Sequence, residues 1–209
     1  MTDVQTVSDT QIDVDGTYCI SLAQNNDRRK NIVNAFTPIC GDITFWIPEK
    51  DASNPERGCF KSHQEVARDA LDKGCETILV LEDDAQLDFL PRRKIVSRVN
   101  RFISTNSFEL FFIGGIVKEA RPTKHRSIAR CKFLCTHAYI LSKAGMRHLV
   151  SVEYEGVPVD VMYLTNFRSY CSVPIFVSQT PETSSSSAIA QYAGRDSGRN
   201  ERFWRSNRY

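Results

Sequence analysis

Short apolar runs alternate with stretches of helical periodicity along most of the chain. The apolar runs predict strands over residues 17–22, 43–47, 77–81, 109–113, 133–141 and 171–177. Apolar positions three or four residues apart predict helices over residues 26–36, 59–71, 92–103, 143–150 and 159–167. Strands that alternate with helices indicate an α/β fold, with a mostly parallel, doubly wound central sheet flanked by helices.

The strand expected at residues 77–81 ends in three carboxylates, Glu82, Asp83 and Asp84. A continuous apolar run of this kind is typical of a central strand that is covered on both faces. In doubly wound sheets, ligands bind beyond the carboxyl ends of the strands, which is where these side chains lie. Because side chains alternate along an extended segment, we expect Glu82 and Asp84 on one side and Asp83 on the other.

Adjacent carboxylates repel one another and lose hydration when buried, so a cation or hydrogen-bond donors must compensate them. An all-oxygen site favours Mn²⁺ or Mg²⁺ over zinc, and phosphate oxygens commonly complete the coordination of such ions. Glu82 and Asp84 are therefore candidate metal ligands, with a diphosphate as the natural partner. The alternative is an exposed acidic turn that binds nothing. A zinc site at Cys131, Cys135 and His137 is disfavoured by their unusual spacing.

Composition points to one globular domain, with 41% hydrophobic and 25% charged residues. We expect a flexible segment over residues 1–16, a single domain over residues 17–187, and an Arg- and Ser-rich segment over residues 188–209 that is mobile or ordered on ligand binding. Gly114 and Gly115 are expected to open a polar loop that extends to Arg130. The net charge of +2 gives no strong case for nucleic acid as a partner.

Seven cysteines, an odd number without a Cys-x-x-Cys pair, indicate reduced thiols rather than a disulfide framework. The first sixteen residues lack the pattern of a signal peptide, and the apolar runs are too short to span a bilayer. We therefore predict a cytoplasmic location and no membrane span.

Several blocks of sequence follow one another in an order and spacing that resemble glycosyltransferase family 25. The first three blocks are Tyr18-Cys-Ile-Ser-Leu with Asp27-Arg-Arg, Gly58-Cys-Phe-Lys-Ser-His, and Leu79-Val-Leu-Glu-Asp-Asp. The later ones are Thr136-His-Ala-Tyr, Pro158-Val-Asp and residues 179–184. The resemblance implies a nucleotide-diphospho-sugar transferase fold of the GT-A type, metal dependence, and inversion at the anomeric carbon. It covers roughly residues 17–187, and Lys61 within the second block is a departure from the family pattern.

The resemblance also implies roles for individual residues. Asp84 would bind the metal directly, while Glu82 and Asp83 would hold metal-bound water and the ribose of the donor. Arg28 matches the family's donor-binding arginine, although a solvated arginine in a first helical turn is the alternative. Ser62 and His63 match the family's Ser-His pair and would support the donor site, although His63 also falls on the apolar face of its helix, where a hydrogen-bonded structural histidine is the alternative.

Three further residues follow from the later blocks. Asp160 is our candidate for the general base that activates the acceptor, with helix capping as its alternative role. His137 and Tyr139 should face the same side of a strand and line the donor-sugar pocket, although core packing explains Tyr139 equally well. Gln179 begins a segment that is expected to close over the diphosphate.

The predicted protein is thus an inverting glycosyltransferase that uses Mn²⁺ or Mg²⁺. It would move galactose or a related hexose from a nucleotide-diphosphate donor, a UDP-sugar in particular, to a hydroxyl of a glycan acceptor. Two other functions remain open at this point. One is another metal-dependent nucleotide-processing enzyme, which would usually need a second carboxylate cluster. The other is a noncatalytic sugar-nucleotide-binding domain of a longer protein.

Overall fold

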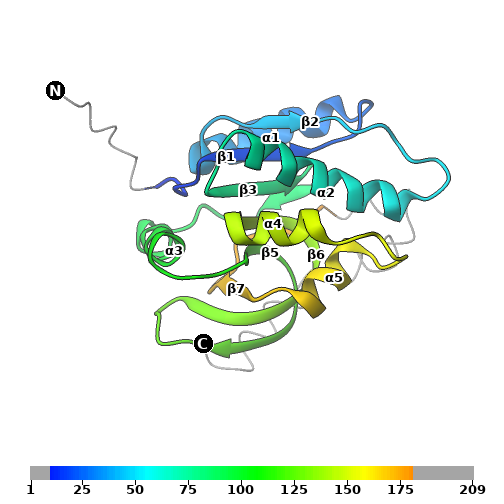
Figure 1. The fold of residues 1–209 in the computed structure, drawn as a ribbon. Coiled ribbons are helices and arrows are strands. Elements are labelled where there is room, and N and C mark those ends of the chain that lie inside the picture. Colours follow the sequence, from blue (N-terminus) through cyan, green and yellow to red (C-terminus); the bar gives the residue numbers. More distant parts are fainter. Residues whose placement is uncertain (1–9, 181–209) are drawn as a thin grey trace.

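The computed structural model describes residues 10–180, in which an eight-stranded sheet carries helices on both faces (Figure 1). The strands are β1 (Gly16–Ile20), β2 (Thr44–Trp46), β3 (Thr77–Glu82), β4 (Ala85–Leu87), β5 (Leu110–Pro122), β6 (Ile128–Ser142), β7 (Ser169–Ser172) and β8 (Val177–Gln179). The helices are α1 (Asn26–Cys40), α2 (Pro55–Asp72), α3 (Arg93–Thr105), α4 (Lys143–Ser151) and α5 (Val159–Asn166). Residues 1–9 of the predicted N-terminal segment, residues 181–187 of the predicted domain and the whole predicted segment over residues 188–209 lie outside the described residues.

The sheet has the strand order β2-β1-β3-β6-β7-β5-β8-β4. Strand β1 is parallel to β2 and β3, and β5 is parallel to β7 and β8, whereas β6 is antiparallel to β3, β5 and β7. The α/β class is confirmed, but the sheet is mixed rather than mostly parallel. The reason is that β5 and β6 are joined by a short turn, which permits only antiparallel pairing, whereas parallel pairing needs a long crossover.

Strand β3 forms the centre of two hydrophobic cores. Its residues Ile78 and Val80 face a core covered by α2, α4 and α5, and Leu79 and Leu81 face a second core covered by α1 and α3. All four side chains have no exposed surface. The continuous apolar run therefore serves both faces, as the sequence predicts, and fixes the position of the carboxylates that follow it.

The polar loop expected over residues 114–130 is wrong, because β5 continues to Pro122 and pairs with β6 in a long hairpin. Gly114 and Gly115 lie within strand β5 and do not start a loop. A Cβ atom on Gly114 would lie 2.7 Å from both Cβ and the carbonyl oxygen of Val177 in β8, and Gly115 has φ of +136° within an irregular part of the strand pair. The glycines thus allow a close approach of β8 and a local kink.

Two other boundaries differ from the prediction. Helix α2 begins at Pro55, four residues early, because Asn54 accepts a hydrogen bond from the backbone N–H of Arg57 and proline suits the first helical turn. The last strand is divided into β7 and β8 by a segment that contains Pro174, whose nitrogen cannot donate to a strand ladder. Within residues 10–180, none of the helices combines the length and apolar composition that a membrane crossing requires.

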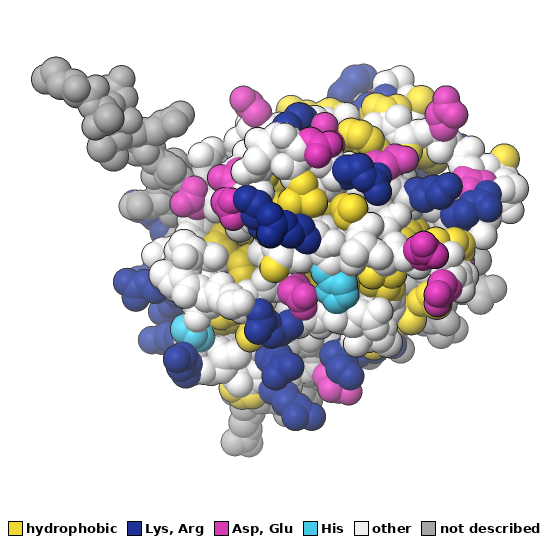
Figure 2. All heavy atoms as spheres, in the orientation of Figure 1, with side chains coloured by type: hydrophobic (Ala, Val, Ile, Leu, Met, Phe, Trp, Pro, Cys, Tyr) yellow, Lys and Arg dark blue, Asp and Glu magenta, His cyan; other side chains and the backbone are white. Residues whose placement is uncertain are grey.

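Lys and Arg side chains, with few acidic ones among them, lie at the left and in the lower part of the face in Figure 2, where Figure 1 shows α3 and the β5–β6 hairpin. The overall charge is close to balanced, so this concentration is local.

The close approach of β5 and β8 makes a stability prediction. Gly114→Ala would place a methyl group against the Val177 carbonyl, and we expect it to lower the free energy of unfolding by about 1–3 kcal/mol. Gly16→Ala is the matched control, because the nearest atom to its Cβ, on Tyr18, lies at 3.4 Å. Urea unfolding of both variants measures the difference, and equal stabilities would contradict the prediction.

Candidate metal site and adjoining cleft

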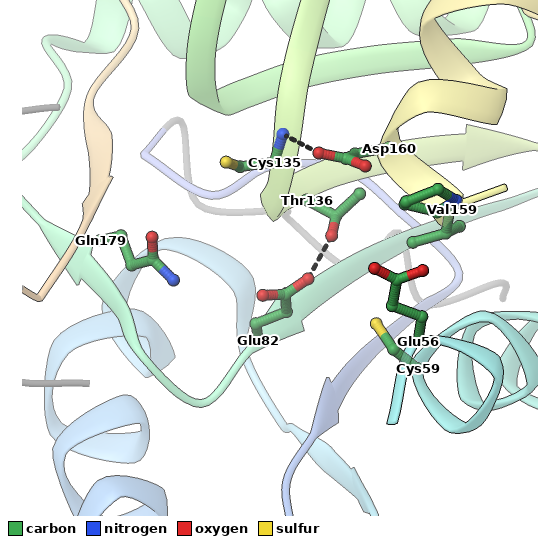
Figure 3. A pocket seen from close by; sticks show the side chains of 9 residues that line it. Glu56, Cys59, Glu82, Cys135, Thr136, Val159, Asp160 and Gln179 are labelled. Atoms are coloured by element: carbon green, nitrogen blue, oxygen red, sulfur yellow. Dashed lines mark hydrogen bonds between the residues drawn. The ribbon is translucent and has the colours of Figure 1, made fainter. Parts of the chain in front are cut away.

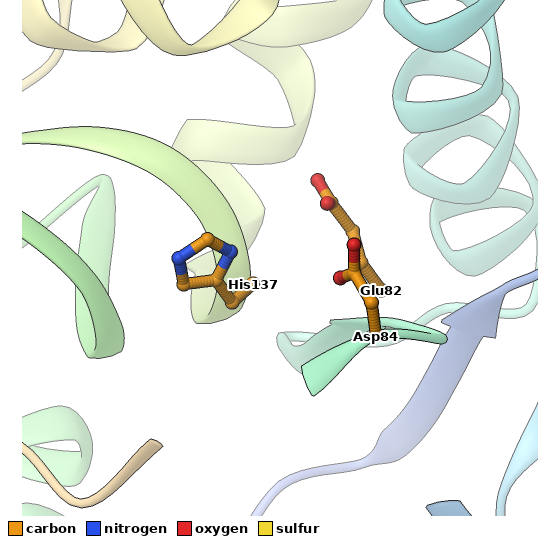
Figure 4. A group of neighbouring side chains, drawn as sticks. All are labelled: Glu82, Asp84 and His137. Carbon is orange, nitrogen blue, oxygen red and sulfur yellow. The ribbon is translucent and has the colours of Figure 1, made fainter. Parts of the chain in front are cut away.

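The three carboxylates at the end of β3 point in two directions. Glu82 and Asp84 lie together with His137 of β6, and the nearest ligand atoms of the three side chains are all within 4.8 Å of one another (Figure 4). Asp83 is turned away toward α1. This is the separation that the alternation of side chains predicts for Glu82, Asp83 and Asp84.

Hydrogen bonds from two neighbouring elements hold the Glu82 carboxylate. Thr136 of β6 donates its hydroxyl to Glu82, and His63 Nε2 of α2 lies 3.5 Å from Glu82 Oε1. Burial raises the pKa of Glu82, but the hydrogen bond and charge of His63, the charge of His137 and the Thr136 hydroxyl outweigh it and lower the pKa below its ordinary value. Glu82 is therefore held as a carboxylate.

His63 is itself fixed by a buried pair of tyrosines. Its Nδ1 lies 2.5 Å from the Tyr139 hydroxyl, which in turn lies 3.2 Å from the Tyr163 hydroxyl. All three side chains are almost completely buried. Tyr139 thus supports His63 from the core, and the expectation that it lines the donor pocket does not fit this structure; core packing, the alternative, does. Burial raises the pKa of Tyr139 and Tyr163, so both are neutral hydrogen-bonding groups.

Asp83 is compensated by charge. Arg28 Nη1 donates to Asp83 Oδ1 at 3.1 Å, and Asn25 Nδ2 donates to Asp83 Oδ2 at 2.9 Å. Asn25 precedes α1 but makes no side-chain cap to that helix, because its amide is directed at Asp83 instead. Arg28 keeps 37% of its side chain exposed, so its remaining N–H groups are available in the cleft wall.

Asp84 receives a hydrogen bond from the last strand. Gln179 Nε2 in β8 donates to Asp84 Oδ2 at 2.7 Å. Burial raises the pKa of Asp84 above its ordinary value, the negative charges of Glu82 and Asp83 raise it further, and His137 and the Gln179 amide offset only part of this effect. The folded chain therefore resists ionisation of Asp84 unless a cation joins the group.

The residues present fit a divalent cation. Two carboxylates and an imidazole converge, and burial followed by the charge of Glu82 raises the pKa of Asp84, an effect that a bound cation would oppose. The sequence predicts an all-oxygen donor set, whereas the group in the structure also contains an imidazole, so a cation bound here could have a nitrogen ligand from His137. His137 was predicted to line the sugar pocket. Its place beside Glu82 depends on the pairing of β3 with β6, which the sequence alone does not reveal.

A cleft of about 500 Å³ opens beside Glu82 and Asp84. It lies between the ends of β1 and β3 and the starts of α1 and α2, and its walls include the predicted donor-site residues Arg28, Ser62, His63, Glu82 and Asp83. Ser62 presents little surface, because it is 3% exposed and its hydroxyl donates to the Gly58 carbonyl within α2. The cleft thus unites the donor-site residues predicted from the first three sequence blocks.

A smaller hollow of about 50 Å³ adjoins the cleft, and Glu56, Cys59 and Glu82 line both (Figure 3). Asp160 and Gln179 also border it, so the predicted base and Glu82 line the same hollow. Burial raises the pKa of Cys59, and the charges of Glu82, Asp160, Asp84 and Glu56 add to the effect. Four carboxylates therefore surround a neutral thiol.

Asp160 and Glu56 differ in their partners. Asp160 Oδ2 accepts a hydrogen bond from the backbone N–H of Cys135 at 3.1 Å, and its Oδ1 accepts from that of Val161 at 2.8 Å. Cys135 has φ of 62°, so this bond supports a left-handed residue next to Thr136. Within residues 10–180, the Glu56 carboxylate forms no hydrogen bond or ion pair. Sequence reasoning did not select Glu56, although it stands next to the second motif block.

Comparison with known proteins gives a consistent set of relatives. The family model described as "Glycosyltransferase family 25 (LPS biosynthesis protein)" matches residues 38–118. Procollagen galactosyltransferase 1 of Danio rerio is 28% identical over 121 residues, which is 52% of this chain and 20% of the relative. Procollagen galactosyltransferase 2 of Homo sapiens is 31% identical over 121 residues, or 52% of this chain and 19% of the relative. The chain therefore spans about a fifth of the length of these relatives.

A solved glycosyltransferase "involved in the glycosylation of the major capsid of PBCV-1" shares 9% sequence identity with the chain. The alignment covers 90% of this chain and 98% of that one, with a TM-score of 0.47.

The raised pKa of Asp84 makes a prediction about stability. A carboxyl group whose pKa is raised on folding contributes stability at low pH, and this contribution is lost as the pH rises through the folded-state pKa. At neutral pH, Asp84→Asn is therefore expected to raise the melting temperature of the chelator-treated protein, while it keeps an acceptor for the Gln179 amide.

Calorimetry in the presence of EDTA measures this effect. Glu155→Gln, at an exposed position outside the helices and strands, is the matched control and should leave the melting temperature unchanged. A lower melting temperature for Asp84→Asn than for wild type would show that the ionised carboxylate stabilises the fold.

Proposed function

The sequence matches support assignment of the chain to glycosyltransferase family 25, and on this premise we propose that it is a metal-dependent, inverting glycosyltransferase. The donor is a nucleotide-diphosphate sugar, with a UDP-sugar favoured over other donors, and the acceptor is a hydroxyl group of a glycan. The observation that carries the proposal is the convergence of Glu82, Asp84 and the buried His137, of which Glu82 and Asp84 line the 500 Å³ cleft. Galactose is the favoured sugar because both curated relatives are named galactosyltransferases.

Glu82, Asp84 and His137 would hold the metal. When bound, the ion supplies a Lewis acid that neutralises charge on the leaving diphosphate. An imidazole together with two carboxylates favours Mn²⁺ over Mg²⁺, because Mg²⁺ prefers oxygen ligands throughout. His63 and Thr136 would keep Glu82 ionised and oriented, as residues behind metal ligands commonly do.

Arg28 and Asp83 would bind the nucleotide part of the donor. Asp83 fixes one edge of the Arg28 guanidinium, which leaves the other N–H groups to bind anionic or carbonyl oxygens in the cleft. Gln179 would act at the junction of the two cavities. Its Nε2 is bonded to Asp84, and its Oε1 is buried without a hydrogen-bond donor among the described residues, so it can accept a bond from a hydroxyl group of the substrate.

An inverting displacement needs a base on the acceptor side of the anomeric carbon. Asp160 is proposed for this role because it borders the hollow next to Glu82. Glu56 is a second candidate, since its carboxylate reaches both cavities and has no partner among the described residues. Whichever acts would accept the proton of the acceptor hydroxyl as the hydroxyl oxygen attacks the sugar.

A noncatalytic sugar-nucleotide-binding domain is the competing function, because it would need the same cleft but no base. We also propose a cytoplasmic location, since all seven cysteines are free thiols.

The donor proposal predicts a metal-dependent thermal shift. At a ligand concentration about a hundred times Kd, we expect UDP or a UDP-sugar with Mn²⁺ to raise the melting temperature by about 5–10 °C. GDP and GDP-sugars should have a smaller effect. Asp84→Ala should abolish the shift, whereas Asp72→Ala, a charge removal on the surface of α2, should preserve it. No shift with any nucleotide in the wild type would reject the donor site.

The two candidate bases make separable predictions. If Asp160 is the base, Asp160→Asn lowers kcat by about 10²–10⁴-fold, and Glu56→Gln has a small effect; the opposite pattern assigns the base to Glu56. Transfer from the donor to a glycan acceptor is measured with each variant, and donor binding by thermal shift is the control. Full activity in both variants would reject both assignments, and donor binding without transfer in the wild type would favour the noncatalytic function.

A further inference from the structure

Helix α3 begins with a charge pattern that opposes its own stability. Arg92 is the N-cap residue and makes no side-chain cap, and Arg93 and Lys94 follow in the first turn, which contains no acidic residue. The N-terminus of a helix carries a partial positive charge, so cations there are unfavourable. All three side chains are exposed, and an anion outside the protein would meet both the side chains and the helix dipole.

The neighbouring β5–β6 hairpin also places like charges where they are unfavourable. Arg121 of β5 and Arg130 of β6 are directly paired in register, and both are exposed. Like charges in directly opposed positions destabilise an antiparallel pair. Arg126 adds a further exposed cation in the turn that joins the strands. Folding does not account for these positions, whereas binding to an extended anionic surface does.

The two elements are in contact and form one surface. Arg98 Nη1 of α3 donates to Ser127 Oγ in the hairpin turn at 2.8 Å, and the rings of Phe102 and His125 meet edge to face with centroids 5.3 Å apart. Residues 91–132 contain eleven Lys and Arg and two Glu, although the whole chain is almost neutral. Within residues 10–180, Lys94 and Arg101 form no ion pair with any carboxylate. The resulting concentration of positive charge is visible in Figure 2.

An exposed apolar pair stands at the edge of this surface. Phe89 is 46% exposed and Leu90 is 64% exposed, and they directly precede Pro91 and the basic start of α3. Among the described residues, Leu90 has the most exposed large hydrophobic side chain. An aromatic and an aliphatic side chain beside a cluster of Lys and Arg match the interface of an anionic bilayer, where apolar groups enter the acyl boundary and cations meet the head groups.

We propose that Phe89, Leu90, the basic face of α3 and the β5–β6 hairpin dock the protein onto the surface of a membrane that contains anionic lipids. The exposed apolar pair favours this partner over a nucleic acid or an acidic protein segment, because neither needs two inserted hydrophobic side chains next to the cations. This docking is peripheral, so it needs no membrane-spanning helix. It also does not depend on the proposed catalytic activity, since membrane binding needs neither donor nor acceptor.

The test measures co-sedimentation of the full-length protein with vesicles of phosphatidylcholine alone and with vesicles enriched in phosphatidylglycerol. Wild type should bind the second kind and release as salt increases. Arg92→Glu combined with Lys94→Glu should weaken binding by at least about 25-fold, from about fivefold for each removed cation. This variant should fold, because acidic residues are favourable at a helix N-terminus. The matched control is Lys61→Glu with Arg68→Glu on exposed positions of α2, which should bind like wild type.

Leu90→Ser separates a membrane from another polyanion. It should weaken vesicle binding several-fold and leave binding to heparin unchanged, because heparin has no apolar phase. The proposal is overturned if wild type does not bind anionic vesicles, or if the α3 and α2 charge reversals weaken binding equally. It is also overturned if Leu90→Ser has no effect on vesicle binding, which would assign the surface to a polyanion such as a nucleic acid.

Discussion

Compensation of three adjacent carboxylates at the end of a fully buried strand is the constraint on which this structure depends. Each carboxylate is compensated differently. Glu82 is held by His63 and Thr136, Asp83 is paired with Arg28, and Asp84 receives an amide hydrogen bond but keeps a raised pKa. Asp84 is the carboxylate whose ionised form a bound cation would favour most, and Glu82 lies beside it as the second candidate ligand, whereas Asp83 is turned away.

The compensating groups come from distant parts of the chain, so the global topology serves the site. The pairing of β3 with β6 brings Thr136 to Glu82, and the pairing of β4 with β8 brings Gln179 to Asp84. Strand β8 reaches this position because Gly114 leaves room for its backbone against β5. The irregular hairpin is thus a structural requirement of the site, because a regular strand with larger residues would displace β8 and the Gln179 amide with it.

The sequence was sufficient wherever a local pattern decided the outcome. The run at residues 77–81 has one interpretation, because an apolar segment buried on both faces can stand only in the middle of a layered domain. The divergence of Asp83 from Glu82 and Asp84 follows equally from strand geometry. Long-range pairing decided the rest. The β3–β6 register places His137 beside Glu82 and Asp84, and it places the Tyr139 hydroxyl against His63. No local sequence pattern contains this register.

The starts of α2 and α3 show how far helix chemistry alone explains a residue. Helix α2 begins with an Asn54 cap, a proline and Glu56, an acidic residue in the first turn that the helix dipole favours. Helix stability alone thus explains an acidic residue at position 56. The further argument for a chemical role is that the Glu56 carboxylate has no partner among the described residues and that Glu56 lines both cavities. Helix α3 begins with cations and no side-chain cap, against each of these rules. Residues that break local stability rules are expected at functional sites and binding surfaces. The start of α3 breaks these rules and Glu56 does not, so the evidence for an external partner at α3 is stronger than the evidence that Glu56 is a base.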